Sequence, residues 1–151
     1  MSSQITVACD IGGVVRDLAT GEAVAGALDG LAELASSHRL IFISKCGPGF
    51  KERILSWLAA RDLSAIPIFF CEEDEQKVNI ARDQRVAVMV DDRIQVLRTF
   101  PESATKVWLC SDEKKIAGTI KHQRELFETF QHARTWPDVM HFVQARAEVV
   151  L

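Results

Sequence analysis

Short apolar runs alternate with longer amphipathic segments along this chain, and this alternation restricts the possible folds more than any other feature of the sequence. Five runs have the length of a β-strand and cover 5–9, 40–43, 66–70, 86–90 and 106–109. The middle runs are almost continuously apolar, which is typical of strands buried on both faces of a parallel sheet. A parallel sheet is therefore expected.

Amphipathic segments with helical spacing lie between the apolar runs. The predicted helices cover 23–37, 48–61, 74–83 and 93–100, and two more follow Thr119, the second with Thr135 as its N-cap. This order predicts an α/β fold, in which a doubly wound parallel sheet lies between two helical layers in a three-layer α/β/α arrangement. With 151 residues and no linker or repeat, the chain is expected to form a single domain over 1–151.

Composition and charge argue against several classes of function. The 18 Lys and Arg residues and 21 Asp and Glu residues give a formal net charge of −3, so a general nucleic-acid partner is not expected. The apolar runs are far shorter than the roughly 20 residues that span a bilayer, and the polar N-terminus is unlike a signal peptide, so no membrane partner is expected. The four cysteines form no CxxC pattern, which favours reduced thiols in a cytoplasmic protein.

Charged and hydroxyl side chains gather where the predicted strands end. Ligands of an open parallel sheet bind at the carboxyl ends of its strands, so these residues are expected to converge at one edge. In chain order they are Asp10 after the first run, Ser44 and Lys45 after the second, Lys77 in the helix after the third, and Asp91 and Asp92 after the fourth.

This set of residues suits phosphoryl transfer to a carboxylate. Asp10 is a candidate nucleophile that would form an aspartyl-phosphate. Asp10 and Asp91 supply the oxygen ligands that Mg²⁺ prefers, and the ion would offset the repulsion between the nucleophile and the phosphate. Ser44 could donate a hydrogen bond to a phosphate oxygen, and Lys77 could add positive charge as the transition state develops.

The same residues stand in the order of four motifs of the haloacid dehalogenase-like superfamily, and the chain resembles that superfamily over 10–92. The first motif corresponds to Asp10-Ile11-Gly12-Gly13-Val14, the second to Ser44, the third to Lys77 and the fourth to Asp91-Asp92. Lys77 precedes Asp91 by 14 residues, which leaves room for one helix and one strand. The resemblance implies a Rossmann-like core, hydrolase activity and a Mg²⁺ cofactor.

The resemblance also implies a role for each matching residue. Asp10 looks like the nucleophile and a metal ligand, and Ser44 looks like the phosphate-binding hydroxyl. Lys77 looks like the lysine that orients nucleophile and phosphate. In the metal site, the resemblance assigns the backbone carbonyl of Gly12, the carboxylate of Asp91, and Asp92 as a second ligand, directly or through water. Lys45, beside Ser44, is a further candidate for contact with the substrate.

Gly12 departs from the pattern of many phosphatases of this superfamily, which carry a second aspartate there as general acid and base. Glycine can supply a carbonyl but cannot move a proton, and losing general acid–base help costs roughly 10²–10⁴ in rate. Asp17 or water could take over the proton transfer. The enzyme could instead act only on substrates with good leaving groups, or it could be a dehalogenase, since some dehalogenases of this superfamily lack the second aspartate. Alternatively, the protein is a catalytically weakened or non-catalytic binding or regulatory protein.

No cap domain is expected, because the intervals 10–44 and 44–77 are filled by the predicted core elements and a small hairpin near Thr20 and Gly21. A site without a cap is open. It would suit a large phosphorylated substrate or macromolecule, or a site completed by a second subunit in a homo-oligomer.

Overall fold

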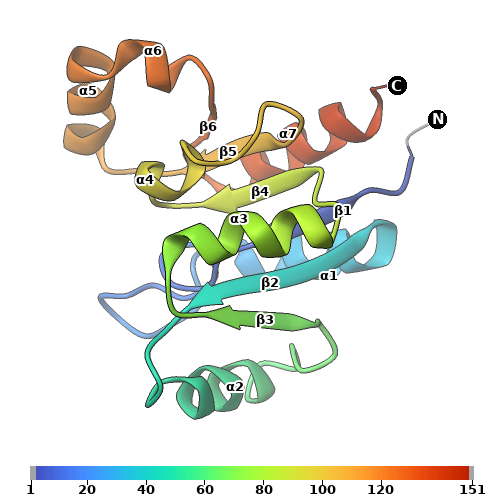
Figure 1. The fold of residues 1–151 in the computed structure, drawn as a ribbon. Coiled ribbons are helices and arrows are strands. Elements are labelled where there is room, and N and C mark those ends of the chain that lie inside the picture. Colours follow the sequence, from blue (N-terminus) through green and yellow to red (C-terminus); the bar gives the residue numbers. More distant parts are fainter. Residues whose placement is uncertain (1–2, 150–151) are drawn as a thin grey trace.

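A six-stranded sheet forms the centre of the structure, a computed structural model that describes residues 3–149. All neighbouring strands are parallel, and their order is β3-β2-β1-β4-β5-β6 (Figure 1). The strands are β1 (Thr6–Cys9), β2 (Arg39–Lys45), β3 (Ile68–Cys71), β4 (Val88–Asp91), β5 (Thr105–Leu109) and β6 (Gln131–Ala133).

Helices cover both faces of this sheet. They are α1 (Ala27–Ser37), α2 (Lys51–Ala59), α3 (Asp74–Asp83), α4 (Ile94–Leu97), α5 (Glu113–His122), α6 (Arg124–Phe127) and α7 (Trp136–Ala147). One apolar core joins the sheet to α1, α2 and α7, and a second core joins the opposite face to α3, α4, α5 and α6. Figure 1 shows α3 in front of the sheet and α1 behind it. The predicted doubly wound α/β/α fold is confirmed.

The continuous apolar runs follow from this double burial. Successive side chains of a strand point to opposite faces of the sheet. In β4, Val88 and Val90 enter one core, whereas Met89 between them enters the other. Since both faces are covered by helices, the positions inside the central strands are apolar on both faces, and only the strand ends carry polar residues such as Asp91.

The chain forms a tight hairpin between β1 and α1, near the predicted position. The backbone N–H of Asp17 donates to the carbonyl of Glu22 at 2.8 Å, and that of Val24 donates to the carbonyl of Val15 at 2.8 Å. This pairing delays the start of α1 to Ala27, four residues later than the apolar spacing predicts. The interval from Asp10 to β2 holds only this hairpin and α1.

The C-terminal part of the chain differs most from the prediction. It holds α5, α6, a sixth strand and α7, where two helices after Thr119 are predicted. The sixth strand was not predicted because it is only three residues long and its sequence, Gln131-His132-Ala133, is not an apolar run. The start of α7 is as predicted, with the side chain of Thr135 accepting from the backbone N–H of Asp138 at 3.4 Å.

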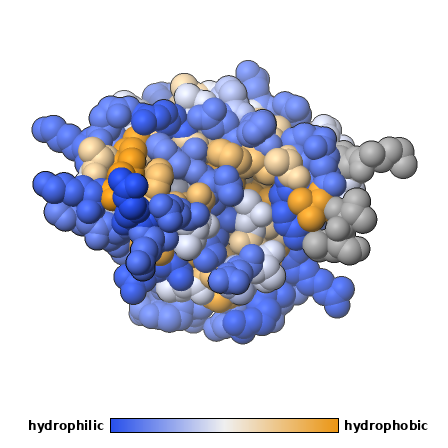
Figure 2. All heavy atoms as spheres, turned by 90° about the horizontal axis from the view of Figure 1, so that it is seen from above, coloured by the Kyte–Doolittle hydropathy of each residue, from blue (hydrophilic) through white to orange (hydrophobic). Residues whose placement is uncertain are grey.

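The outer faces of the helical layers are mainly polar. Seen from above the view of Figure 1, the surface is largely hydrophilic, and hydrophobic side chains are restricted to small separate areas (Figure 2). None of the described helices combines the length and the apolar character needed to cross a membrane.

Candidate active site

The candidate site lies at the carboxyl ends of β1 and β4, the two central strands. These strands are neighbours, and Cys9 is in register with Val90. Asp10 follows β1, and its backbone N–H donates to the carbonyl of Val90 at 3.0 Å. Asp91 is the last residue of β4. The order of the sheet reverses between these strands, which is the position where ligands bind in open α/β sheets.

A third carboxylate completes a cluster at this point. Asp10, Asp91 and Asp92 each offer a carboxylate oxygen, and these atoms all lie within 4.8 Å of one another. Asp91 is fully buried and Asp10 is 8% exposed, so water screens their charges poorly. The Oδ1 atom of Asp92 is buried and finds no hydrogen-bond partner among residues 3–149. Three converging carboxylates with one unsatisfied oxygen fit a divalent cation that prefers oxygen ligands.

The loop after β1 is shaped to admit the carboxylate of Asp92. Gly13 has φ +79°, and a Cβ atom built there would lie 2.1 Å from Oδ2 of Asp92. Glycine adopts this left-handed conformation without strain, and it leaves space that any side chain would fill. Because position 13 is a glycine, the carboxylate of Asp92 can lie close to the loop after β1. The first and fourth predicted motifs therefore meet at this point.

The pKa values of the carboxyl groups in this cluster reflect their crowding and burial. Burial, with the nearby charge of Asp91 as a second cause, raises the pKa of Asp10 to about 7. Burial and Asp91 likewise raise the pKa of Asp92 to about 6. Carboxyl groups that are removed from water beside like charges hold their protons more tightly. A bound cation would reverse this effect, because it would favour the charged form of each carboxylate.

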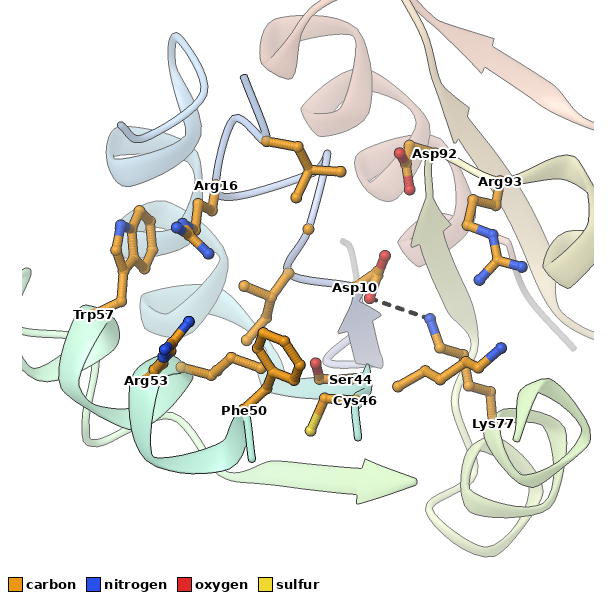
Figure 3. Close-up of a pocket in the computed structure, with 15 residues that line it drawn as sticks. Asp10, Arg16, Ser44, Cys46, Phe50, Arg53, Trp57, Lys77, Asp92 and Arg93 are labelled. Carbon is orange, nitrogen blue, oxygen red and sulfur yellow. Dashed lines mark ion pairs between the residues drawn. The ribbon is translucent and has the colours of Figure 1, made fainter. Parts of the chain in front are cut away.

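Lys77 supplies the positive charge inside the cluster. Its side chain is 1% exposed, and its Nζ atom lies 3.1 Å from Oδ1 of Asp10 and 3.1 Å from Oδ2 of Asp91 (Figure 3 marks the pair with Asp10). Burial by itself would lower the pKa of Lys77, but the two carboxylates outweigh burial and raise it. Lys77 thus remains charged and holds Asp10 and Asp91 in fixed positions.

Ser44 and Lys45 reach the same region from the end of β2. Ser44 is 3% exposed and lines the pocket in front of Asp10. Lys45 also lines the pocket, but its Nζ atom forms an ion pair with Asp74 at 3.4 Å. Asp74 additionally accepts two hydrogen bonds from the guanidinium of Arg93, at 3.3 and 3.0 Å. Burial raises the pKa of Asp74, but Arg93 and Lys45 outweigh it, so the net shift is downward.

The pocket in front of these residues has a volume of about 480 Å³, a size that suits a small-molecule ligand. All the predicted site residues except Asp91 line it, and Asp91 lies beneath them, paired with Lys77. Sequence reasoning missed much of the remaining wall. The residues that it did not single out include Arg16, Phe50, Arg53, Trp57 and Arg93.

Gly12 and Asp17 bear on the missing general acid. Gly12 lines the pocket beside Asp10. Asp17 belongs to the hairpin, where its Oδ1 atom accepts from the backbone N–H groups of Ala19 at 2.8 Å and Thr20 at 3.3 Å. It is not among the residues that line the pocket within the described chain. The carboxylate of Asp17 therefore stabilises a turn and does not line the pocket in front of Asp10.

Comparisons with known proteins identify the fold. No protein-family model matches the chain, and no curated protein matches its sequence. Among solved structures, D,D-heptose 1,7-bisphosphate phosphatase from Burkholderia thailandensis aligns with a TM-score of 0.67 at 16% identity, over 93% of this chain and 98% of that chain.

Two proteins described as haloacid dehalogenase-like hydrolases also align with this chain. The protein from Burkholderia xenovorans has a TM-score of 0.58 at 14% identity over 85% of this chain, and this chain spans 61% of its length. The protein from Xanthomonas campestris has a TM-score of 0.56 at 14% identity over 83% of this chain, which spans 55% of its length. The chain therefore has the fold of the haloacid dehalogenase-like hydrolases, as the order of its motifs predicts.

Proposed function

We propose that the protein is a Mg²⁺-dependent phosphatase-like hydrolase that uses Asp10 as its nucleophile on a phosphate ester. The observation that carries this proposal is the position of Lys77, whose Nζ atom lies 3.1 Å from carboxylate oxygens of both Asp10 and Asp91. The lysine orients one oxygen of Asp10, and the pocket lies in front of the same residue. The shared fold supports the assignment.

The metal would be held by Asp10, Asp91, Asp92 and the backbone carbonyl of Gly12. The unsatisfied Oδ1 atom of Asp92 and the close approach at Gly13 support this set of ligands. When bound, Mg²⁺ would supply positive charge that lowers the repulsion between a carboxylate nucleophile and a phosphate dianion.

The chain's own residues account for the remaining chemistry. A carboxylate oxygen of Asp10 attacks phosphorus, and the bond between phosphorus and the leaving oxygen breaks. The leaving oxygen takes the electron pair and then a proton from water, because Gly12 has no side chain to donate one. Ser44 donates a hydrogen bond to a phosphate oxygen, and Lys77 balances the developing charge.

Hydrolysis of the aspartyl-phosphate then restores the protein. A water oxygen attacks phosphorus, the bond between phosphorus and Asp10 breaks, and inorganic phosphate leaves. The proton of the attacking water passes to solvent. Without a general base, this step is expected to be slow compared with that of an enzyme that has one, by roughly 10²–10⁴.

A second function is favoured by one observation, the glycine at position 12. A site that retains metal ligands, lysine and hydroxyl but lacks the proton-transfer group could bind a phosphorylated compound or macromolecule without useful turnover. In this alternative the protein is a binding or regulatory protein. It would bind Mg²⁺ and inorganic phosphate through the same residues.

Release of inorganic phosphate from a panel of aryl and alkyl phosphates, with and without Mg²⁺, tests the proposal. We expect Mg²⁺-dependent turnover that falls to the background rate in Asp10→Asn. Asp17→Asn is the matched control, because it makes the same change of charge outside the pocket, and it should keep its activity. Turnover that survives Asp10→Asn would exclude Asp10 as the nucleophile. Calorimetric binding of Mg²⁺ and phosphate without turnover across the panel would favour the alternative.

A further inference from the structure

One end of the pocket is lined by the half-buried Arg16 and the exposed Arg53, whose charges no acid of the described chain balances. Figure 3 shows Arg16 and Arg53 at the end opposite Lys77. Within the described chain, neither guanidinium takes part in an ion pair. The Nε atom of Arg16 is moreover buried without a hydrogen-bond partner. A buried donor without a partner is costly, and such groups in native proteins call for an explanation.

The other basic residues of the pocket differ in this respect. Lys77 is paired with Asp10 and Asp91. Lys45 and Arg93 share the carboxylate of Asp74. Each basic residue near the nucleophile thus has an acidic partner, whereas Arg16 and Arg53 have none in the described chain and are available to a ligand.

Both arginines stand on elements that are fixed relative to each other. Arg16 belongs to the hairpin, where its backbone bridges to Gly12 and Ala23. Arg53 is on α2, with its guanidinium over the ring of Phe50 at 5.5 Å. The indole N–H of Trp57, one turn further along α2, donates to the carbonyl of Gly21 in the hairpin at 2.7 Å.

We propose that Arg16 and Arg53 form a subsite for a second anionic group, so that the preferred substrate is a phosphate monoester whose alcohol part carries a further phosphate or carboxylate. The proposal rests on the proposed function, which places the ester phosphate beside Asp10. Guanidinium groups bind planar carboxylates and phosphates through paired hydrogen bonds. A ligand that spans the pocket would thus meet an anion site at each end.

An anionic group fits this end of the pocket better than a neutral or aromatic one. A neutral group would leave both guanidinium charges without an opposite charge in the described chain. An aromatic group would compete with the guanidinium of Arg53, which already lies over the ring of Phe50. A group with a full negative charge would offset the charges of both arginines.

Non-hydrolysable probes test binding separately from turnover. We would use alkyl phosphonates of graded chain length that end in methyl, carboxylate, a second phosphonate or phenyl, with Mg²⁺ and the wild-type protein in a calorimeter. Loss of one charge-assisted contact corresponds to roughly tenfold in affinity or more. We expect the two anionic series to bind at least about tenfold more tightly than the methyl series at the best chain length. Whether the carboxylate or the phosphonate series binds more tightly then shows which anionic group the subsite prefers.

Substitutions of the two arginines then test whether these residues cause the tighter binding of anionic probes. Arg16→Gln and Arg53→Gln should each weaken the anionic probes by about tenfold and leave the methyl series nearly unchanged. Lys51→Gln is the matched control, because it makes the same change of charge on α2 while Lys51 contacts Phe70 outside this pocket. Equal binding of the methyl and anionic series, or tighter binding of the phenyl series, would overturn the proposal.

A kinetic comparison separates failure of this subsite from failure of the proposed function. The pairs are fructose 6-phosphate with fructose 1,6-bisphosphate, and glycerol 3-phosphate with 3-phosphoglycerate. Turnover with no preference within either pair would contradict the subsite and leave the phosphatase assignment standing. No turnover of any ester, together with selective binding of the anionic phosphonates that the arginine variants lose, would contradict only the phosphatase assignment.

Discussion

Two adjacent glycines in the loop after β1 have different physical reasons for lacking a side chain. Gly13 has a left-handed backbone, and a Cβ atom there would collide with the carboxylate of Asp92. Gly12 has no such constraint, because the nearest atoms to a Cβ atom there all belong to the side chain of Leu18, with Cδ2 closest at 3.2 Å. Leu18 is 71% exposed and can move aside. The geometry of the site thus requires glycine at position 13. Glycine at position 12 is not required by the geometry, and it leaves the site without a proton-transfer group.

This contrast predicts that Gly12→Asp is tolerated and adds the missing proton-transfer group. For alkyl phosphates, whose leaving oxygen needs a proton, we expect kcat/KM to rise by roughly 10²–10⁴. For p-nitrophenyl phosphate, whose leaving group departs as a stable anion, the first step should change little. Phosphate release at low substrate concentration gives kcat/KM for both substrates, a quantity that the shared hydrolysis of the aspartyl-phosphate does not enter. Gly12→Asn is the control of similar size that cannot transfer a proton. Equal gains in kcat/KM for both substrates, or the same gain for Gly12→Asn, would contradict the prediction.

At the scale of elements, α1 and α7 pack closely where Gly30 meets Trp136. Gly30 of α1 faces the indole of Trp136 at the start of α7, and a Cβ atom at Gly30 would lie 2.6 Å from the Cε3 atom of the ring. The indole N–H of Trp136 in turn donates to the carbonyl of Val14 at 2.9 Å. The C-terminal helix therefore holds the loop that follows β1, four residues from the candidate nucleophile.

Alanine substitutions at two helical glycines should have opposite effects on stability. Gly30→Ala overfills a buried contact with a rigid ring, and we expect the free energy of unfolding to fall by roughly 1–3 kcal/mol. A Cβ atom at Gly118 in α5 would have no neighbour within 4 Å, so Gly118→Ala changes only the helix propensity. We expect the free energy of unfolding to rise by about 0.5–1 kcal/mol. Urea denaturation of both variants measures these changes. A Gly30→Ala protein as stable as the wild type would show that the two helices can separate without cost.

Elements differ in how far the sequence could predict them. The apolar runs predicted five strands, and α3 has its predicted bounds of Asp74–Asp83 because an acidic start and a short amphipathic pattern agree there. The start of α1 could not be predicted, since the pairing of Val15 with Val24 competes locally with the helix. The arginine end of the pocket was also missed. It depends on the contact of Trp57 with Gly21, which joins segments 36 residues apart.

The candidate site itself was better predicted than its surroundings. Asp10, Ser44, Lys77 and Asp91 converge because each stands at or near the carboxyl end of a neighbouring parallel strand, a rule that needs no side-chain detail. The partners of Lys45 depend instead on the rotamers of Asp74 and Arg93, which no spacing in the sequence specifies.

At the scale of the whole molecule, folding concentrates negative charge that the overall balance conceals. The formal net charge is only −3, yet three carboxylates lie within 4.8 Å of one another and the described residues place a single lysine among them. Like charges in a poorly hydrated place oppose the folded state unless an opposite charge joins them. A metal ion that binds the folded state alone would therefore stabilise the entire protein by mass action.

Magnesium is accordingly expected to raise the free energy of unfolding. At a free concentration about 100-fold above its dissociation constant, the gain is about 2.7 kcal/mol, and EDTA should abolish it. Asp92→Asn should be at least as stable as the wild type in EDTA, because the substitution removes one negative charge from the crowded carboxylate cluster, but it should gain little from Mg²⁺. Thermal and urea unfolding with and without Mg²⁺ measure both effects, and KCl at equal ionic strength controls for screening. If KCl stabilised the wild type as much as Mg²⁺ does, the carboxylates would not be metal ligands. If Asp92→Asn gained as much from Mg²⁺ as the wild type, the carboxylate of Asp92 would not be one of the ligands.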